Sequence, residues 1–269
     1  MTWPARPFAP LNRPIRDWRG LRVWIVGASS GIGAALARRL AHEGARLILS
    51  ARSAERLAEI ARDCTGALIE TMDVTRPDDY ARVRDRIVSA LGGIDVVVLN
   101  AGTYAPLRAW ELASAAGAGA AHAMLRTNLL GVIDGVAAVV PHLLERGQGA
   151  IAVVGSVAGY SGLPRAAVYG ATKAALINFA EALYLDLRPR GVSVFLIDPG
   201  FVATPLTAGN DFHMPALIQP ERAADDIVAG FARGAFEVHF PRRFTTVLKL
   251  LRCLPYRLYF AIVGRTTGT

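Results

Sequence analysis

A phenol and an ammonium lie four residues apart in the segment "YGATK", where Tyr169 precedes Lys173. On a helix, residues i and i+4 share a face, so these two side chains are expected to lie side by side. A free phenol has a pKa of about 10, and a nearby ammonium favours phenolate and lowers that pKa. The pair therefore predicts a general acid that protonates an oxygen on which negative charge develops, as in hydride addition to a carbonyl.

Two polar residues earlier in the chain fit the same chemistry. Ser156 ends the apolar run "GAIAVVGS" and can donate a hydrogen bond to a substrate oxygen. Asn128 lies in "AMLRTNLLGVID", an expected helix interior where asparagine has poor propensity, and this misfit suits a functional position. Taken alone, Tyr-x-x-x-Lys is most often an ordinary helix face. Ser156 and Asn128 favour the catalytic interpretation of Tyr169 and Lys173.

A glycine-rich turn, "GASSGIG" (27–33), follows the first apolar run, "LRVWIV" (21–26). Glycines at Gly27, Gly31 and Gly33 allow a tight turn that brings a pyrophosphate close to backbone N–H groups at a helix N-terminus. Ser29 and Ser30 add hydroxyl donors. Many proteins use such glycines only to turn, but the position between a strand and a helix indicates a dinucleotide site.

The end of the second expected strand, "LSARS", suggests which dinucleotide is bound. NAD-binding folds commonly place an acid here to accept hydrogen bonds from the ribose 2′-hydroxyl. This chain has Ala51 and then Arg52. Because a guanidinium binds a phosphate with a fork of donors, the sequence predicts NADP(H) rather than NAD(H). The alternative is a surface arginine at a strand end.

Strands and helices alternate along the chain. Apolar strand-like runs are expected at 21–26, 46–51, 67–72, 94–100, 149–156, 193–198 and 236–240, with helices at 31–45, 53–64, from 77 onward, 108–146 and 220–233. Such alternation predicts an α/β fold, a parallel sheet covered on both faces. Ligands then bind beyond the carboxyl ends of the strands, which is where the candidate residues fall.

The bulk properties fit one large domain. The chain has 269 residues, is 52% hydrophobic, and carries two cysteines and a formal net charge of +8. The distant cysteines favour a reducing, cytoplasmic location and argue against a metal site. The Arg- and Pro-rich residues 1–20 lack the apolar core of a secretory signal, and no uninterrupted apolar run is long enough to predict a spanning helix. No aromatic-interleaved basic groove indicates nucleic acid.

These features together resemble the short-chain dehydrogenase/reductase family in its single-domain form, over roughly residues 20–240. The matching motifs occur in order: "GASSGIG" (27–33), "DVT" (73–75), "NAG" (100–102), Asn128, Ser156, "YGATK" (169–173) and "PGFVATP" (199–205). Two positions depart from the family pattern. Val26 stands where a threonine usually precedes the turn, and Leu99 where a first asparagine precedes "NAG". Both usual residues are thought to brace nearby loops.

The resemblance implies a three-layer, doubly wound Rossmann fold of about seven strands in the order 3-2-1-4-5-6-7. It implies one catalytic domain at 21–243, an extension at 1–20 and a basic, apolar extension at 244–269. It also implies homodimers or homotetramers. Tyr169 would be the general acid, Lys173 would bind the nicotinamide ribose, Ser156 would position the carbonyl and Asn128 would hold a water in the proton relay.

The resemblance assigns the cofactor contacts as well. Asp73 and Val74 would lie beside the adenine, although Asp73 could instead cap the following helix. The remaining contacts would be made by Ile32 in the glycine-rich turn, by Asn100, Ala101 and Gly102 near the adenine ribose, and by Pro199, Gly200, Val202 and Thr204 near the nicotinamide. The family activity is hydride transfer between a nicotinamide and a ketone or secondary alcohol. A cofactor-binding regulatory or scaffold protein on the same fold is the alternative.

Two segments bear on substrate and surroundings. The 201–219 segment is apolar at Leu206, Phe212, Met214, Leu217 and Ile218, which favours a hydrophobic substrate or, equally, a cover for the domain core. The tail "FTTVLKLLRCLPYRLYFAIVGR" (244–265) has apolar and basic residues and a break at Pro255. It predicts either packing against the domain or a partner subunit, or an interfacial segment with peripheral membrane contact.

Overall fold

The computed structural model describes residues 9–267. Its centre is a seven-stranded sheet, and the strands lie in the order β3-β2-β1-β4-β5-β6-β7. Every neighbouring pair is parallel. The strands are β1 (Arg22–Val26), β2 (Arg46–Ala51), β3 (Leu68–Thr71), β4 (Val96–Leu99), β5 (Gly149–Val154), β6 (Val192–Pro199) and β7 (Glu237–Phe240). The predicted fold class and strand order are confirmed.

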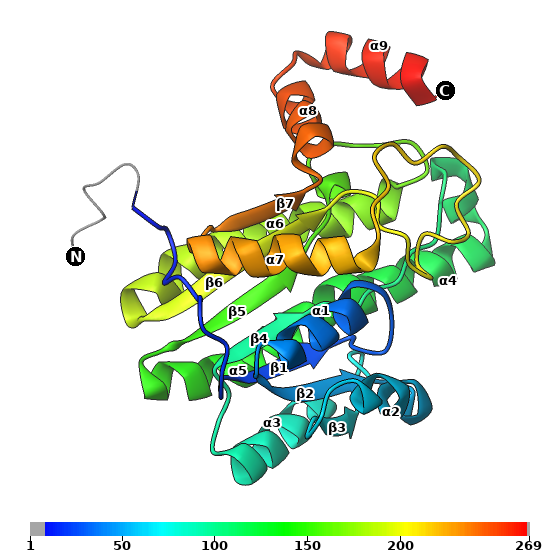
Figure 1. The fold of residues 1–269 in the computed structure, drawn as a ribbon. Coiled ribbons are helices and arrows are strands. Elements are labelled where there is room, and N and C mark those ends of the chain that lie inside the picture. The colour runs from blue at the N-terminus through cyan, green and yellow to red at the C-terminus, as the bar shows by residue number, and fades with distance from the viewer. Residues whose placement is uncertain (1–8, 268–269) are drawn as a thin grey trace.

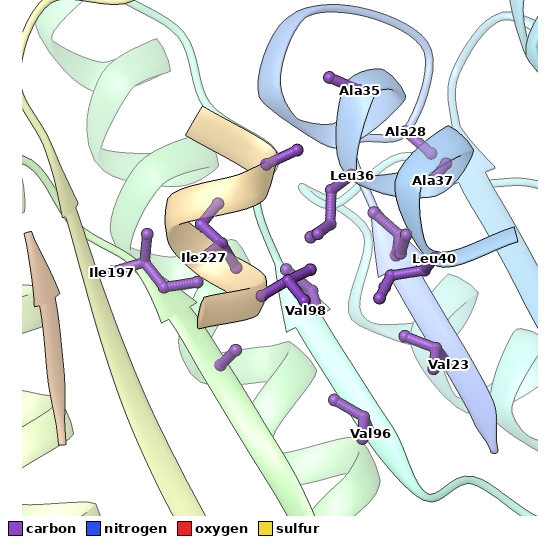
Figure 2. Packing of buried hydrophobic residues seen from close by; sticks show 14 of the residues in the cluster. Val23, Ala28, Ala35, Leu36, Ala37, Leu40, Val96, Val98, Ile197 and Ile227 are labelled. Carbon is purple, nitrogen blue, oxygen red and sulfur yellow. The ribbon is translucent and has the colours of Figure 1, made fainter. Parts of the chain in front are cut away.

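Helices cover both faces of the sheet and give three layers (Figure 1). They are α1 (Gly31–His42), α2 (Ala54–Arg62), α3 (Pro77–Leu91), α4 (Ala115–Met124), α5 (Gly131–Arg146), α6 (Ala167–Leu187) and α7 (Pro220–Arg233). On one face, Leu36 and Leu40 of α1 and Ile227 of α7 point toward the strands, where they meet Val98 and Ile197 (Figure 2). A second buried cluster joins α3, α5 and α6 to the other face.

The long helical region expected over 108–146 is divided. A short 3₁₀ helix, Ala109–Ala113, precedes α4, and a π-helical stretch, Leu125–Leu130, joins α4 to α5. Among the described residues, Ala115–Arg146 is one helical run long and apolar enough to cross a bilayer by length and composition. Within the fold, Val136, Val139 and Leu143 of this run are buried in the core. It therefore behaves as a core helix of the domain.

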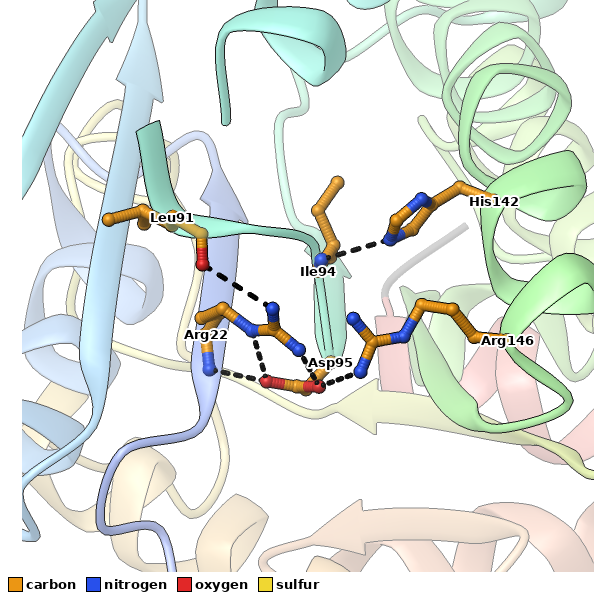
Figure 3. A network of polar contacts seen from close by, with 6 residues as sticks. All are labelled: Arg22, Leu91, Ile94, Asp95, His142 and Arg146. Atoms are coloured by element: carbon orange, nitrogen blue, oxygen red, sulfur yellow. Dashed lines mark hydrogen bonds and ion pairs between the residues drawn. The ribbon is translucent and has the colours of Figure 1, made fainter. Parts of the chain in front are cut away.

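The amino ends of the strands are joined by an ionic network around Asp95, just before β4 (Figure 3). Arg22 of β1 donates to both carboxylate oxygens, through Nε at 2.7 Å and its terminal nitrogen at 2.7 Å, and Arg146 of α5 donates at 2.9 Å. Burial alone would raise the pKa of Asp95, but hydrogen bonds from Arg22 and the two guanidinium charges hold it below its usual value. The network fixes β1, β4 and α5 at the end of the sheet opposite the candidate site.

Residues 9–20 lie against the domain, although the sequence marked 1–20 as an extension; residues 1–8 of it lie outside the described residues. The Asn12 amide donates to Val194 O at 2.6 Å and accepts from Val194 N at 3.0 Å. Val194 precedes the β6 residues that pair with β7, which begin at Leu196. Trp18 is buried and contacts the Phe231 ring edge-on. The side chain of Asn12 thus completes the β6 edge where β7 has not yet begun.

The chain ends in two helices after β7. They are α8 (Arg242–Arg252) and α9 (Tyr256–Thr267), and the break predicted at Pro255 is confirmed. Thr245 of α8 is fully buried and hydrogen-bonds His239 at 2.6 Å. The Tyr259 hydroxyl of α9 donates to Gly162 O at 2.8 Å. These contacts attach both helices to the domain, beyond the end of β7 (Figure 1).

Candidate active site

A cavity of about 720 Å³ opens at the carboxyl ends of the strands, where the parallel-sheet rule placed it. Nearly all the predicted site residues line it. They are Gly27, Ser29, Ser30, Gly31, Ile32, Arg52, Asp73, Val74, Asn100, Ala101, Gly102, Ser156, Tyr169, Lys173, Pro199, Gly200, Val202 and Thr204. Gly33 and Asn128 lie behind its wall. No group of three or more potential metal ligands occurs within residues 9–267.

The glycine-rich turn is shaped by close backbone approaches. Gly27 has φ +90°, and a Cβ there would lie 2.7 Å from Ala101 N. A Cβ on Gly33 would lie 2.2 Å from Gly27 O, so Gly33 serves packing rather than contact with the cavity. Asn100 donates to Gly27 O at 2.9 Å. This single asparagine therefore braces the turn, even though Leu99 and Val26 replace the family's usual residues.

The turn fits a dinucleotide on its own geometry. Ser30 precedes α1 in an extended conformation, and its side chain makes no capping hydrogen bond to the helix. The first-turn N–H groups of α1 thus face the cavity without a side-chain acceptor, which is the arrangement that binds a pyrophosphate. Gly31 has φ +55°, and a Cβ there would lie 2.9 Å from Thr204 Cγ2. A larger residue would push the turn away from the loop after β6.

The cavity end beside β2 is basic. The exposed side chains of Arg52 and Arg56 both line it, and within residues 9–267 no hydrogen bond or ion pair reaches either guanidinium. Arg56 escaped the sequence analysis because no pattern in its own segment marks it as a ligand. Its position is set by Ser53, which caps α2 by accepting a hydrogen bond from Arg56 N at 3.3 Å.

Asp73 lies at the same end. Its carboxylate accepts hydrogen bonds from the backbone N–H of Thr75 at 2.9 Å and from the Thr75 hydroxyl at 2.8 Å. These bonds, first among them that from the Thr75 N–H, lower the pKa of Asp73 against the effect of burial, and Arg52 adds to the shift. Through these bonds Asp73 does cap the turn that follows it, although Arg76 occupies the N-cap position of α3 itself.

The side chain of Lys173 is held in place by a hydrogen bond to the end of β5. It is buried, one turn after Tyr169 on α6, and its Nζ donates to Val154 O at the end of β5 at 2.9 Å. Nζ lies 5.7 Å from the centre of the Tyr169 ring. Burial lowers the pKa of Lys173 to about 8, and the charge of Asp198 opposes that shift. The predicted proximity of the two side chains on α6 is thus present in the structure.

The sequence predicts that Lys173 lowers the pKa of Tyr169, but the protein groups alone do not produce a lowered pKa. Burial raises the pKa of Tyr169 to about 12, hydrogen bonding with Ser156 opposes the shift, and Tyr104 and Asp198 add to it. The ammonium sits over the ring and donates to a backbone carbonyl, so it does not compensate for the desolvation of the phenol. The phenol is accordingly held in its protonated, proton-donating form.

Tyr104 is a site residue that the sequence analysis missed. Its ring meets Tyr169 edge-on, with centroids 4.9 Å apart, and it lines the cavity. An aromatic pair of this kind restrains the catalytic ring as well as burying it. Tyr104 lies two residues after "NAG" in a loop, where no periodicity marks it.

Asn128 sits in the π-helical stretch and is fully buried. Its Oδ1 accepts from Thr103 N at 2.7 Å and its Nδ2 donates to Thr103 O at 2.8 Å. The amide therefore ties the helical run to the loop after "NAG". The helix misfit predicted for Asn128 corresponds to a real interruption of α-helical geometry, which often occurs at functional sites. A water-holding role stays a prediction.

Ser156 begins a short 3₁₀ turn directly after β5. Its hydroxyl accepts from Ala158 N at 3.1 Å and lies 3.5 Å from Pro199 O, a long contact. A hydroxyl with an acceptor this distant can turn toward a substrate oxygen at little cost. Ser156, Tyr169 and Lys173 thus converge on one region of the cavity wall from β5 and α6.

Comparison with known proteins identifies the architecture. The short chain dehydrogenase family model matches residues 22–213. The chain belongs to the short-chain dehydrogenase/reductase family. It is 35% identical to an uncharacterized oxidoreductase of Myxococcus xanthus over 249 residues, covering 90% of this chain and 95% of that one. It is 34% identical to a putative ketoacyl reductase of Streptomyces coelicolor, covering 79% and 83%.

Solved structures agree with this assignment. A serine dehydrogenase complexed with NADP⁺ superposes with a TM-score of 0.75 at 26% identity, covering 82% of this chain and 94% of that one. A Burkholderia phymatum short-chain dehydrogenase/reductase complexed with NAD gives a TM-score of 0.80 at 24% identity, covering 88% and 94%. Both of these neighbours carry a nicotinamide dinucleotide, and the protein is an oxidoreductase of the same family.

This short-chain dehydrogenase/reductase carries a buried acid that the sequence analysis also missed. Asp198, in β6 just before Pro199, is fully buried, and no N–H or hydroxyl donor among the described residues reaches either of its carboxylate oxygens. A Cβ on Gly155 would lie 2.2 Å from Asp198 Oδ1. Burial raises the pKa of Asp198 well above its usual range, the charge of Glu237 and hydrogen bonding with that carboxyl add to the shift, and Lys173 and Lys249 oppose it. The signal was an acid within the apolar run "SVFLID".

The 201–219 segment of this dehydrogenase only partly follows its prediction. Leu206 lines the cavity, whereas Ile218 forms a bridge with Val202 and packs against the core. Phe212 and Leu217 are exposed. The alternative of a cover for the core therefore holds for Ile218, whereas contact of Leu206 with a hydrophobic substrate stays a prediction. Arg165, in the loop before α6, pairs with Asp211 at 2.5 Å and connects the segment to the helix that carries Tyr169.

Proposed function

We propose that the protein is an NADP(H)-dependent carbonyl reductase or alcohol dehydrogenase that acts on a hydrophobic ketone or secondary alcohol. The observation that carries this proposal is the convergence of Ser156, Tyr169 and Lys173 on the cavity that also holds the glycine-rich turn. A protein that only bound a dinucleotide would have no need of a protonated phenol in this place. The bound dinucleotide would supply or accept the hydride.

The protein residues would supply the proton and the positions. Ser156 Oγ would donate a hydrogen bond to the substrate oxygen, and the Tyr169 hydroxyl would protonate that oxygen as charge develops on it. The raised pKa of Tyr169, about 12, keeps the phenol loaded with its proton. Lys173, fixed by Val154 O, would bind the ribose and favour the phenolate that forms. Asn128 would complete the proton relay through a water.

The preference for NADP(H) rests on Arg52 and now also on Arg56. Two guanidiniums line the β2 end of the cavity, and the described structure offers them no partner. An added 2′-phosphate would find donors there, whereas the acid typical of NAD specificity is replaced by Ala51. Asp73 accepts two hydrogen bonds from Thr75, and we assign its carboxylate to contact with the adenine of the dinucleotide.

The hydrophobic substrate is suggested by Leu206, which lines the cavity, and by Phe212 and Leu217, which are exposed apolar residues of the same 201–219 segment. The similarity to a putative ketoacyl reductase is consistent with an acyl-type ketone. A cytoplasmic homodimer or homotetramer remains part of the proposal.

The first experiment is a fluorescence titration of purified protein with NADPH and NADH, followed by turnover on ketones and alcohols of rising chain length. We expect tighter NADPH binding and a kcat/KM that rises with chain length. Tighter NADH binding would overturn the Arg52 and Arg56 argument but not the catalytic one. Cofactor binding without turnover on any compound would count against the reductase and favour a regulatory binder.

A further inference from the structure

The outer surface of α8 and α9, here called the C-terminal surface, is both cationic and apolar. After Glu237 the chain has no acidic residue, and Arg242, Arg243, Lys249, Arg252, Arg257 and Arg265 follow. Interspersed with these cations are large exposed apolar side chains, among them Leu250 at 65%, Tyr256 at 78% and Phe260 at 62% exposed. Such side chains occur singly on most surfaces, but here they are concentrated on two consecutive helices.

The inner sides of the same helices are fixed to the domain, so the helices have a defined orientation and a defined outer side. Thr245 is fully buried, Lys249 pairs with Glu237, and Tyr259 and Val263 are buried. The Tyr259 hydroxyl reaches Gly162, in the loop that leads into α6. The packing of the inner sides therefore determines which side chains face outward, and these are the exposed apolar and cationic side chains named above.

The C-terminal surface lies at the active-site end of the sheet. β7 is parallel to the other strands and ends at Phe240, and α8 begins two residues later. α8 therefore starts at the edge at which the cavity opens, and α8 and then α9 project beyond that edge (Figure 1). The loop that Tyr259 contacts also holds Arg165, which pairs with Asp211 of the 201–219 segment.

We propose that the C-terminal surface docks on an anionic lipid bilayer and brings the cavity mouth to the membrane. Charge decides against a second copy of this chain, because two such surfaces face to face would bring ten exposed arginines together, and the one carboxylate at hand, Glu237, is already paired with Lys249. An anionic bilayer offers both phosphate for the cations and hydrocarbon for Leu250, Tyr256 and Phe260. The helices have 11 and 12 residues, too few to span, so they lie in the interface.

Cys253 gives a direct probe of this docking. It is exposed between the two helices, whereas the only other cysteine, Cys64, is buried. The full-length protein, labelled at Cys253 with an environment-sensitive fluorophore, is mixed with vesicles of phosphatidylcholine alone or with 30% phosphatidylglycerol. We expect a blue shift and co-sedimentation only with the anionic vesicles, and release at high salt. Equal binding to neutral vesicles, or no binding to either, would overturn the proposal.

Matched variants locate the binding surface. Arg252→Glu with Arg257→Glu removes two cations, and each cation near an anionic surface contributes about fivefold in partitioning, so we expect a loss of at least about 25-fold. Leu250→Asn with Phe260→Asn should also weaken binding. The controls are Arg46→Glu, at the opposite end of the sheet, and Leu185→Asn, an equally exposed leucine on α6. Equal effects of the control variants would reject the assignment.

The other occupant is tested in the same samples. If light scattering shows that the α8–α9 variants split an oligomer while the parent protein does not bind vesicles, the surface is a subunit interface and the proposal fails. The delivery of an apolar substrate rests on the proposed function, and it is tested by turnover of a long-chain ketone in vesicles. Turnover of soluble ketones tests the proposed function without the membrane, so the proposed function and the proposed docking can fail separately.

Discussion

The two ends of the parallel sheet each hold an aspartate, partly buried at the amino end and fully buried at the carboxyl end, and the surroundings of the two carboxyl groups are opposite. At the amino end, the Asp95 carboxylate accepts four hydrogen bonds, two from side-chain nitrogens of Arg22, one from its backbone N–H and one from Arg146. At the carboxyl end, no N–H or hydroxyl donor in the described part of the chain reaches the Asp198 carboxylate, and its polar neighbour is another carboxyl group, that of Glu237. One end satisfies its polar groups within the protein and so stabilises the fold. The other leaves them unsatisfied, as functional sites often do.

The comparison predicts that polar groups at the carboxyl end can be removed with loss of function but without loss of stability. Tyr169→Phe should give the largest effect, because it deletes the proposed proton donor. We expect kcat/KM for a ketone to fall by about 10²–10⁴-fold, the usual contribution of general acid catalysis. NADPH binding and the unfolding midpoint should stay unchanged, which titration and thermal unfolding would check. Substantial residual turnover would mean that another group donates the proton.

Asp95→Asn should show the reverse pattern. It leaves the largely buried guanidiniums of Arg22 and Arg146 without their anion, and we expect unfolding free energy to fall by about 3 kcal/mol. Because the pKa of Asp95 lies below its unfolded value, its contribution is present above the unfolded pKa and is lost as pH falls through the folded pKa. Urea unfolding at several pH values measures both effects.

The control for Asp95 is Asp85→Asn, which breaks an exposed ion pair with Arg84 and should cost less than about 1 kcal/mol. If Asp95→Asn lowered kcat/KM in the folded protein without lowering stability, the assignment of stability to the amino end of the sheet and of function to the carboxyl end would be wrong.

Asp198→Asn should stabilise the protein at neutral pH. The folded pKa of Asp198 is raised by burial, so its contribution is most favourable below the unfolded pKa and is lost as pH rises through the folded pKa. Asparagine does not ionise, so the Asp198→Asn protein does not lose stability in this way as pH rises. Its advantage over the parent should grow by up to about 1.4 kcal/mol per pH unit above pH 4 and disappear below it. A constant difference across pH would show that Asp198 does not titrate in this range.

Arg52 should give the smallest effect, because it is exposed and acts only through a ligand. Ala51→Asp with Arg52→Leu should shift the NADPH to NADH ratio of kcat/KM about tenfold toward NADH, equal to one charged hydrogen bond. The free energy of unfolding should change little, because Arg52 is exposed and interacts with Asp73 only through its charge. Arg62→Leu, on the same helix as Arg56 but outside the cavity, is the control. An unchanged ratio would contradict the NADP(H) assignment.

The strand order and most of the cavity wall were predicted through the resemblance to the family, which rests on motifs found in order along the chain, whereas the strands, the turn and the catalytic pair follow from local pattern. Apolar runs, glycines and the Tyr169–Lys173 spacing each follow from the backbone geometry of one element. Tyr104, Arg56 and Asp198 escaped because their neighbours come from other elements, which a single segment does not reveal. The pKa of Tyr169 was predicted in the wrong direction for the same reason: the local ammonium was visible in the sequence, and the burial was not.

The Asn12 amide that pairs with Val194 has a consequence for self-association. It imitates one residue of an absent strand and occupies the N–H and C=O groups that β6 would otherwise present at its border. Open strand borders recruit strands from other molecules. A chain shortened past Asn12 would expose such a template beside an apolar sheet. We therefore expect residues 9–20 to limit association of the protein through the border of its sheet.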